Sequence, residues 1–335
     1  MTEGYLERDL IYNPDIKEQY FKRFPEGTHN FFKRIFSLSA LVERGWGQDL
    51  FDFNLRQISG VLRSLNPLTF DSARSAQSII HNYISSMIHH RSNRVNPLDF
   101  VDHRWADQFV DTRRKLLFSK SELYDQLIPL CVNKQDAVII ALPFEGIKGL
   151  QSSEIRNLKL TDVNFENKSI LLTDDKGNRR SIENVTSNCL ELIRNASNED
   201  AYYMKNGNTA PTIRKKEAIA LLETGFVIKP ANTKNTNFEQ VAEHVLQQRL
   251  DTIQRSLQIQ KLTLTNLYRS GMLYMAKEIY RRDGYLSKRS QYEEICEKFN
   301  VSKISNHGHI QYNWTRLKGV INIENIEKIY GFEIV

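Results

Sequence analysis

Two groups of polar side chains in this sequence have the types and spacing needed to bind phosphate. Arg74, Ser78 and Asn82 recur every four residues, on a helix face whose other members are also small, polar and not acidic. Arg179 and Arg180 are neighbours in a segment that alternates like a strand. Cations and hydrogen-bonding side chains of these kinds contact the sugar-phosphate backbone of nucleic acids. A solvated surface would look similar, so the pattern alone leaves both interpretations open.

Histidine pairs suggest metal binding but lack further ligands. His89 and His90 are adjacent, and one glycine separates His307 from His309. Neither pair has a carboxylate or thiolate at the spacing of a zinc site. The chain also has no P-loop and no Gly-x-Gly-x-x-Gly motif. We therefore expect no metal, no nucleotide and no other cofactor.

The charge balance favours an acidic partner. The 335 residues carry a formal net charge of +6, with a pI near 9.0, which is common among nucleic-acid-binding proteins. The first residues are charged from Glu3 onward, and no apolar run approaches membrane-spanning length. Three distant cysteines predict neither a disulfide framework nor a zinc ribbon. We expect a soluble, cytoplasmic protein without a membrane partner.

The first third of the chain predicts an all-helical domain. Apolar residues at helical spacing indicate three helices, over residues 15–44, 53–65 and 71–90. Pro25 and Gly27 interrupt the first helix, and Thr28 has the residue type of a cap that restarts it. We predict a helical amino-terminal domain at residues 1–102 and a linker at 103–118.

The rest of the chain, residues 119–335, predicts helices around one small antiparallel sheet. Three short strands are expected, the last two joined by a tight turn, at residues 160–163, 169–173 and 179–182. Helical patterns occupy most of the remainder, at residues 120–131, 134–144, 185–194, 238–257, 264–280, 291–299 and after 322. The Asn-rich segment 232–237 predicts a loop. The fold class is therefore mainly α with two domains.

This order of elements, together with local motifs, resembles the tyrosine recombinases, or phage integrases. The string GLQSSEIRNLKLTDVNFENKSI, residues 149–170, is similar to the family's first motif, Gly-Leu-Arg-x-Ser-Glu-Leu followed by Asp-Val-Asp. The string LQQRLDTIQRSLQIQKLTLTNLYRSG, residues 246–271, is similar to the second, in which a helix leads to His-x-x-Arg. NPLDF, residues 96–100, lies where the family leaves its core-binding domain. The resemblance spans residues 30–315 and implies a core-binding domain followed by a catalytic domain.

The resemblance also implies a site in which a tyrosine attacks a DNA phosphate among two arginines, a lysine and two histidine-type residues. The first arginine position holds Gln151, and Lys176 matches the hairpin lysine. The His of His-x-x-Arg is Asn266, whereas its Arg is kept as Arg269. Glutamine cannot form the charged, bidentate clamp that arginine makes on phosphate. Losing transition-state stabilisation of that kind costs about 2.7–4 kcal/mol.

The last two matched positions lie near the carboxyl end. The later His or Trp position falls at Val301, and the nucleophile matches Tyr312 if about two extra residues follow Val301. With Asn266 and Val301 in place, neither proton-transfer group of the family remains. We therefore expect no catalytic residues and no DNA cleavage.

These observations predict a sequence-specific DNA-binding transcriptional regulator on an inactive recombinase scaffold, most similar to phage repressors of lytic genes. Its partner would be double-stranded DNA at operator sites in a bacterial host, and self-association or a small phage regulatory protein would be further partners. The expected DNA contacts are Arg74, Ser78, Asn82, Arg156, Lys159, Lys176, Arg179, Arg180 and Arg269. The alternatives are a divergent, active recombinase in which another cation replaces Gln151, and a partner-binding protein that no longer contacts DNA.

Overall fold

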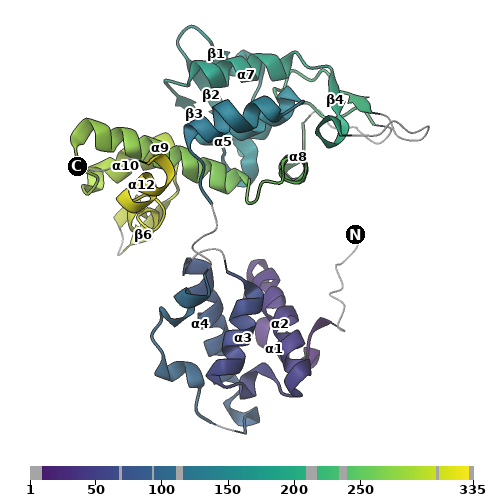
Figure 1. The fold of residues 1–335 in the computed structure, drawn as a ribbon, viewed down its shortest axis with the longest axis vertical. Coiled ribbons are helices and arrows are strands. Elements are labelled where there is room, and N and C mark those ends of the chain that lie inside the picture. The colour runs from purple at the N-terminus through teal and green to yellow at the C-terminus, as the bar shows by residue number, and fades with distance from the viewer. Residues whose placement is uncertain are drawn as a thin grey trace. The chain divides into compact units, whose positions relative to one another are not determined.

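The computed structural model describes residues 10–67, 70–92, 94–110, 116–208, 217–233, 240–306 and 309–331. The chain divides into two units, Met1–Arg114 and Lys115–Val335, each with its own hydrophobic core (Figure 1). Helices predominate in both units, and the strands form small antiparallel sheets. The predicted fold class, mainly α with two domains, is confirmed.

Among its described residues, the first unit has four α-helices: α1 (Pro14–Phe21), α2 (Glu26–Trp46), α3 (Leu55–Leu65) and α4 (Phe70–Ser86). Aromatic rings join three of them in the core. Tyr20 of α1 lies 6.2 Å from Phe36 of α2 and 5.2 Å from Tyr83 of α4, measured between ring centres. Phe36 and Tyr83 are 5.0 Å apart. These edge contacts fix the three helices on one another.

Local signals explain where two of these helices begin. Asn54 and Gln57 exchange side-chain to backbone hydrogen bonds, at 3.0 and 2.9 Å, and so cap α3 near its predicted start. The prediction of a cap at Thr28 is wrong, because α2 begins at Glu26 with Pro25 as its cap. Pro25 lies outside the helical turns, so its missing backbone N–H removes no hydrogen bond of α2 and the helix can start directly after it.

A charged cluster lies buried in this first unit. The Lys17 ammonium is 2.5 Å from Glu43 Oε1 and 3.8 Å from Asp49 Oδ2, and Lys17 and Glu43 are inaccessible to solvent. The Tyr83 hydroxyl donates to Asp49 Oδ1 at 2.9 Å. Burial raises the pKa of the Glu43 carboxyl even though Lys17 opposes the shift. Buried charges persist only when they are paired, so this cluster ties α1 to α2 and to the segment after it.

The connection between the units is shorter than the predicted linker at residues 103–118. The 3₁₀ helix η5 (Trp105–Phe109) belongs to the first unit, where Ala106 N donates to Gln77 Oε1 at 3.0 Å. The rings of Trp105 and Phe109 pack against the first core. Phe118, at the other end of the predicted linker, is buried in the second core. The charged residues around these aromatic side chains give the segment the composition of a linker, although both of its ends are packed.

The second unit surrounds one buried helix, α5 (Lys134–Glu145). Around it lie a sheet of order β1-β2-β3 and three helices: β1 (Val163–Asn164), β2 (Ser169–Thr173), β3 (Arg179–Ile182), α7 (Ser187–Ser197), α8 (Glu243–Leu257) and α9 (Leu264–Asp283). The predicted three-stranded sheet is confirmed, although its first strand is shorter because residues 160–162 form a 3₁₀ turn. Helix α9 crosses α5 very closely. A Cβ at Gly271 would lie 1.9 Å from the Phe144 carbonyl oxygen, so this crossing requires glycine.

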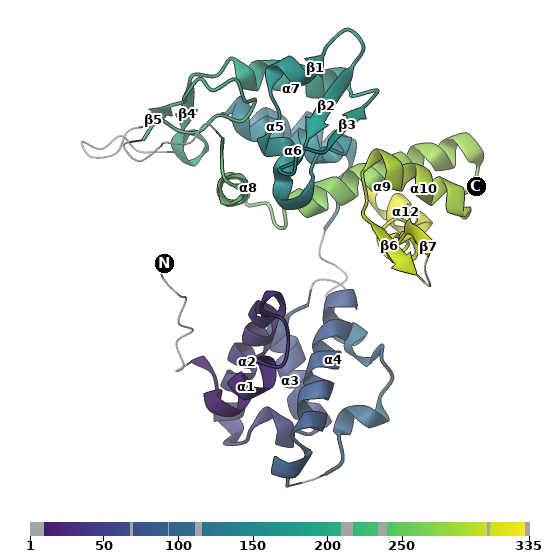
Figure 2. The same ribbon diagram turned by 180° about the vertical axis from the view of Figure 1, so that it is seen from behind.

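A second layer of this unit is formed near the carboxyl end (Figure 2). The later part of α9 packs with three helices around buried Leu273, Ile295 and Ile326: α10 (Arg289–Lys298), α11 (Trp314–Leu317) and α12 (Ile323–Tyr330). A two-stranded ribbon, β6 (Lys303–Asn306) and β7 (His309–Tyr312), belongs to the same layer. Helix α9 therefore contributes to two hydrophobic cores of the second unit.

Several elements differ from the predictions. The ribbon β6–β7 and a second ribbon, β4 (Ala201–Tyr203) with β5 (Ala218–Ala220), were not predicted. The expected helix at 120–131 is a π-helical turn (Glu122–Leu127) followed by a 3₁₀ turn (Ile128–Leu130), because Pro129 has no N–H for a regular helix. Helix α8 begins at Glu243, five residues later than expected. Of the predicted loop 232–237, residues 234–237 lie outside the described residues.

Candidate nucleic-acid interface

The segment that resembles the first recombinase motif forms a left-handed turn into α6 (Ser153–Arg156). Gly149, Gln151 and Ser152 have φ values of 71°, 50° and 59°. A Cβ at Gly149 would lie 2.6 Å from Ser153 Oγ, so the turn requires glycine there. The turn leaves Gln151 exposed and buries Ser152. The position matched to the first catalytic arginine therefore presents a neutral amide to solvent.

Arg180 of β3 reaches the same turn from the sheet. Its Nε donates to Glu154 Oε1 at 2.6 Å, and its Nη2 donates to Glu154 Oε2 at 2.8 Å. Nη2 also donates to the Gly146 carbonyl at 2.7 Å, and Nη1 donates to the Lys298 carbonyl at 3.1 Å. Gly146 follows α5 and Lys298 ends α10, so the Arg180 guanidinium joins α6, α5 and α10.

This environment gives Arg180 a structural role. The Glu154 side chain is 4% exposed and compensates the charge of Arg180, whose side chain is 20% exposed. Four hydrogen bonds occupy most of the five N–H groups that a guanidinium offers. A DNA phosphate would have to displace a buried carboxylate to reach it. The predicted DNA contact by Arg180 therefore finds no support in this geometry.

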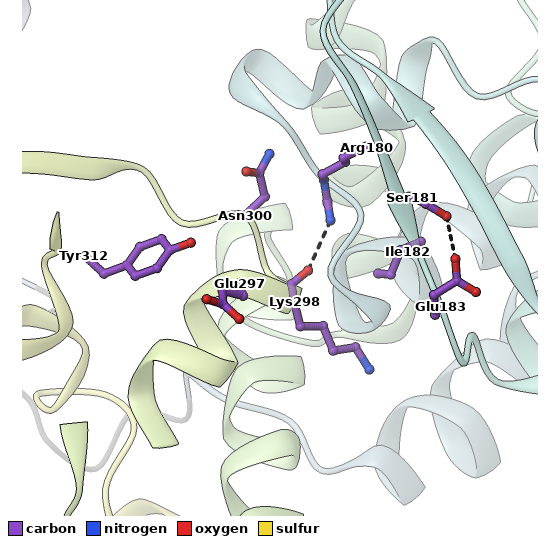
Figure 3. A pocket seen from close by; sticks show the side chains of 8 residues that line it. All are labelled: Arg180, Ser181, Ile182, Glu183, Glu297, Lys298, Asn300 and Tyr312. Atoms are coloured by element: carbon purple, nitrogen blue, oxygen red, sulfur yellow. Dashed lines mark hydrogen bonds between the residues drawn. The ribbon is translucent and has the colours of Figure 1, made fainter. Parts of the chain in front are cut away.

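A pocket of about 440 Å³ opens beside Arg180 (Figure 3). Tyr312 lies across it from β3, and its hydroxyl points into the pocket. The Lys303 ammonium is 4.9 Å from the centre of the Tyr312 ring. Glu183, Glu297 and Lys298 also line the pocket, so the two carboxylates are balanced by Arg180 and Lys298. An arginine and the matched tyrosine thus share one pocket, whose charged lining residues balance one another.

The other positions matched to the recombinase site are occupied by groups that do not transfer protons. Asn266 is buried in the first turn of α9, and its Nδ2 donates to the Lys261 carbonyl at 2.9 Å. Val301 packs half-buried against the carboxyl-terminal core. Arg269 lies half-buried on α9. An amide and an aliphatic side chain cannot replace the family's histidines in acid–base steps.

The β2–β3 hairpin presents two exposed cations. Asp174 Oδ1 accepts from the backbone N–H groups of Lys176 and Asn178, at 2.9 and 2.8 Å, and so shapes the turn. The hydrogen bond from the Asn178 side chain contributes most to lowering the pKa of Asp174, and the backbone N–H groups of Asn178 and Lys176 add to this effect. The side chains of Lys176 and Arg179 are exposed, and neither forms an ion pair with another described residue. They remain available for phosphate contacts, as the sequence predicts.

The two cations predicted beside the first motif have partners within the second unit. Arg156 forms an ion pair with Asp175 of the hairpin turn, and its side chain is 11% exposed. The Lys159 ammonium lies 4.9 Å from the centre of the Phe226 ring. Arg156 therefore holds the hairpin in place, and Lys159 covers an aromatic ring.

The face of α4 that carries Arg74, Ser78 and Asn82 is less suited to binding phosphate than the sequence of the helix indicates. Arg74 forms a bidentate ion pair with Asp107, at 2.8 and 2.6 Å, and the His81 ring lies 2.8 Å from Asp99. The expectation of an acid-free face is wrong, because the segment after α4 folds back and brings these carboxylates onto it. Ser78 and Asn82 are exposed on α4.

Other chemistries gain no support from the described part of the chain. No cluster of three or more His, Cys, Asp or Glu there could hold a metal ion. His89 and His90 are exposed, and His307 lies outside the described residues. The three cysteines are buried and free. No helix in the described ranges is both long and apolar enough to cross a membrane.

Two family models match this chain and together cover most of it. Residues 11–89 match the MrpR N-terminal core-binding domain, and residues 117–331 match the MrpR C-terminal catalytic domain. The predicted order of a core-binding and a catalytic domain is thereby confirmed.

Three individual proteins that are similar to this chain share 27% sequence identity or less with it. The chain is 27% identical over 329 residues to the SPbeta prophage-derived uncharacterized protein YopR of Bacillus subtilis (strain 168), covering 97% of this chain and 98% of that protein. It is similar to the Tn1549 transposon integrase in complex with transposon right end DNA, at 12% identity and a TM-score of 0.45, covering 95% and 98% of the two chains. It is also similar to XerA recombinase, at 13% identity and a TM-score of 0.40, covering 94% and 95%.

Proposed function

We propose that this chain, which belongs to the MrpR family, is a DNA-binding transcriptional regulator that does not cut DNA. The observation that carries the proposal is the pairing of Arg180 with Glu154 beside an exposed Gln151. A recombinase needs guanidinium N–H groups that are free to bind the scissile phosphate. Here the position matched to that arginine is neutral, and the nearby arginine is held by a carboxylate.

DNA binding is supported by the charge and by the family. The formal net charge is +6, and Lys176 and Arg179 are exposed on the β2–β3 hairpin. Phosphate contacts by such cations supply affinity without any chemistry on the DNA. From the sequence resemblance we propose a phage repressor of lytic genes, like the lysogeny master repressor of SPbeta-like Bacillus phages. The relative YopR is SPbeta prophage-derived.

The test is to select genomic fragments bound by the protein and to incubate them with it. We expect retarded electrophoretic mobility, no nick and no covalent protein–DNA adduct. A promoter fused to a reporter and placed downstream of a selected fragment should be repressed when the protein is supplied. Absence of any mobility shift at low salt would contradict the proposal.

A second candidate is an active, divergent recombinase, because Arg180 and Tyr312 line the same pocket. In that case Arg180 would replace the arginine missing at Gln151. A supercoiled plasmid carrying a selected site would then form a covalent adduct with the wild-type protein. The adduct would disappear in Tyr312→Phe, which keeps the ring and removes the nucleophilic oxygen.

A further inference from the structure

The ribbon β6–β7 ends at Tyr312, the position matched to the nucleophile, but its other residues match no recombinase position (Figure 2). Its register pairs Lys303 with Tyr312 and Ile304 with Gln311. Each strand has four residues and is therefore about 13 Å long. The two strands are about 5 Å apart, so a two-stranded ribbon of this size fits a DNA major groove about 12 Å wide.

The register divides the ribbon into two faces, because directly paired residues point to the same side. The inner face contains Lys303, Ser305, Ile310 and Tyr312, and Tyr312 lines the pocket beside Glu183 and Glu297. The outer face contains Ile304, His309 and Gln311. Ile304 is 39% exposed, His309 is exposed and Gln311 is half-buried. Ile310 on the inner face is 77% exposed, so both faces are accessible, but a ligand on the outer face would leave Tyr312 in its pocket.

The charge around the ribbon favours a polyanion. Residues 299–323 contain no acidic side chain but include Lys303, Arg316 and Lys318. No residue of the ribbon forms an ion pair within the described part of the chain. Unlike Arg74 and His81 of α4, Lys303 and His309 of the ribbon are therefore not paired with a described carboxylate.

We propose that the outer face of the ribbon reads base edges in the major groove of double-stranded DNA; this rests on the proposed function and assigns its specificity to Gln311 and His309. A glutamine amide donates to N7 and accepts from the N6 amino group of adenine. The methyl groups of Ile304, beside Gln311 in the register, suit the methyl group of thymine. The ribbon is thus a recognition element, whereas Lys176 and Arg179 supply backbone contacts.

The test uses 30-bp duplexes that the wild-type protein selects from a randomised library, with a shuffled duplex of equal composition as the non-specific probe. In the double variant His309→Ala/Gln311→Ala, affinity for the selected duplex should fall about tenfold or more. Affinity for the shuffled duplex should stay within about twofold, and the salt dependence should not change because no lysine or arginine is removed. Ser305→Ala, on the inner face of the same ribbon, is the matched control and should bind both probes as the wild type does.

A substitution that changes specificity separates base reading from a structural role. Gln311→Glu keeps the length of the side chain, but a carboxylate only accepts hydrogen bonds. It therefore suits the N4 amino group of cytosine, so repeated selection should replace adenine by cytosine at one position of the preferred sequence. An unchanged preferred sequence in this variant, or equal losses on both duplexes in the double variant, would overturn the ribbon assignment. Strand addition to a protein partner would then explain the exposed ribbon better. If the wild-type protein binds no duplex at all, the proposed function fails first, so the two failures are distinguishable.

Discussion

Glu154 and Arg180 are 26 residues apart in the sequence and form a bidentate ion pair in the structure, at 2.6 and 2.8 Å. Glu154 belongs to the segment that resembles the first recombinase motif, whereas Arg180 comes from the hairpin that should supply the catalytic lysine. Arg180 also donates to the Lys298 carbonyl at the end of α10 and to the Gly146 carbonyl directly after α5. The Arg180 guanidinium thereby joins several elements of the second unit.

Replacing Arg180 by alanine should destabilise the second unit by about 2–4 kcal/mol. The substitution leaves the Glu154 carboxylate buried without its cation and frees two helix-end carbonyls. Arg179→Ala, on the same strand but exposed, is the control and should change stability by less than about 0.5 kcal/mol. Urea unfolding followed by circular dichroism measures both variants. Equal stabilities would show that the Arg180 contacts contribute little.

Gly271→Ala should destabilise the second unit by about 3 kcal/mol or prevent its folding. The new Cβ would meet the Phe144 carbonyl oxygen at 1.9 Å, so α9 and α5 would have to separate. Gly60→Ala, in the middle of α3, should instead stabilise the first unit by about 0.5–1 kcal/mol. A Cβ at Gly60 meets only Val42, at 3.9 Å, and alanine favours the helix. Thermal melts of both variants provide the comparison.

Asp136 should make stability fall between about pH 4 and pH 6. Burial raises the pKa of this carboxyl to about 6, although Arg249 opposes the shift. Asn133 and Tyr202 donate to Oδ2, whereas Oδ1 has no partner among the described residues. The unfolded chain releases this proton near pH 4 and the folded protein only near pH 6, so the stabilising contribution is complete below pH 4 and lost as the pH rises through 6.

The variant Asp136→Asn isolates this effect from other titrating groups. Its free energy of unfolding should decrease less than that of the wild type between pH 4.5 and pH 7, with a difference on the order of 1–2 kcal/mol. Urea unfolding at the two pH values gives the comparison. Parallel pH profiles for the two proteins would mean that Asp136 titrates normally.

Removing the two exposed hairpin cations should weaken DNA binding and its dependence on salt. In Lys176→Ala/Arg179→Ala, the slope of log affinity against log salt should become shallower by about 2, close to one for each lost phosphate contact. Arg74→Ala should leave the slope unchanged, because Asp107 already holds that guanidinium. Fluorescence anisotropy with a labelled duplex at four salt concentrations tests both. A shallower slope in Arg74→Ala would instead place α4 on the DNA.

Elements with strong local signals were predictable from the sequence. Helix α3 has an amphipathic pattern and a capping box at Asn54, and β2 and β3 flank a turn organised by Asp174. Helix α5 was predicted at residues 134–144 and is found at Lys134–Glu145. In each case the information lies within a few residues of the element, so tertiary structure only confirms it.

The pairing of charges could not be predicted in this way. Asp107 lies 33 residues after Arg74, and only the folding back of η5 brings it onto α4. Arg180 was expected to contact DNA because its neighbours in the sequence are basic, but Glu154 comes from another element. The ribbon β6–β7 was missed because its apolar residues are few, although the absence of acids over residues 299–323 marks the segment.

The buried Lys17 determines where a shortened version of the protein can begin. Lys17 lies on α1, whereas its carboxylate partners, Glu43 and Asp49, lie on and after α2. Any truncation that removes α1 would leave two carboxylates inside an apolar interior with no cation to neutralise them. Recombinant fragments of the first unit therefore have to start upstream of Asn13, whose side chain also donates to Asp49 at 2.9 Å.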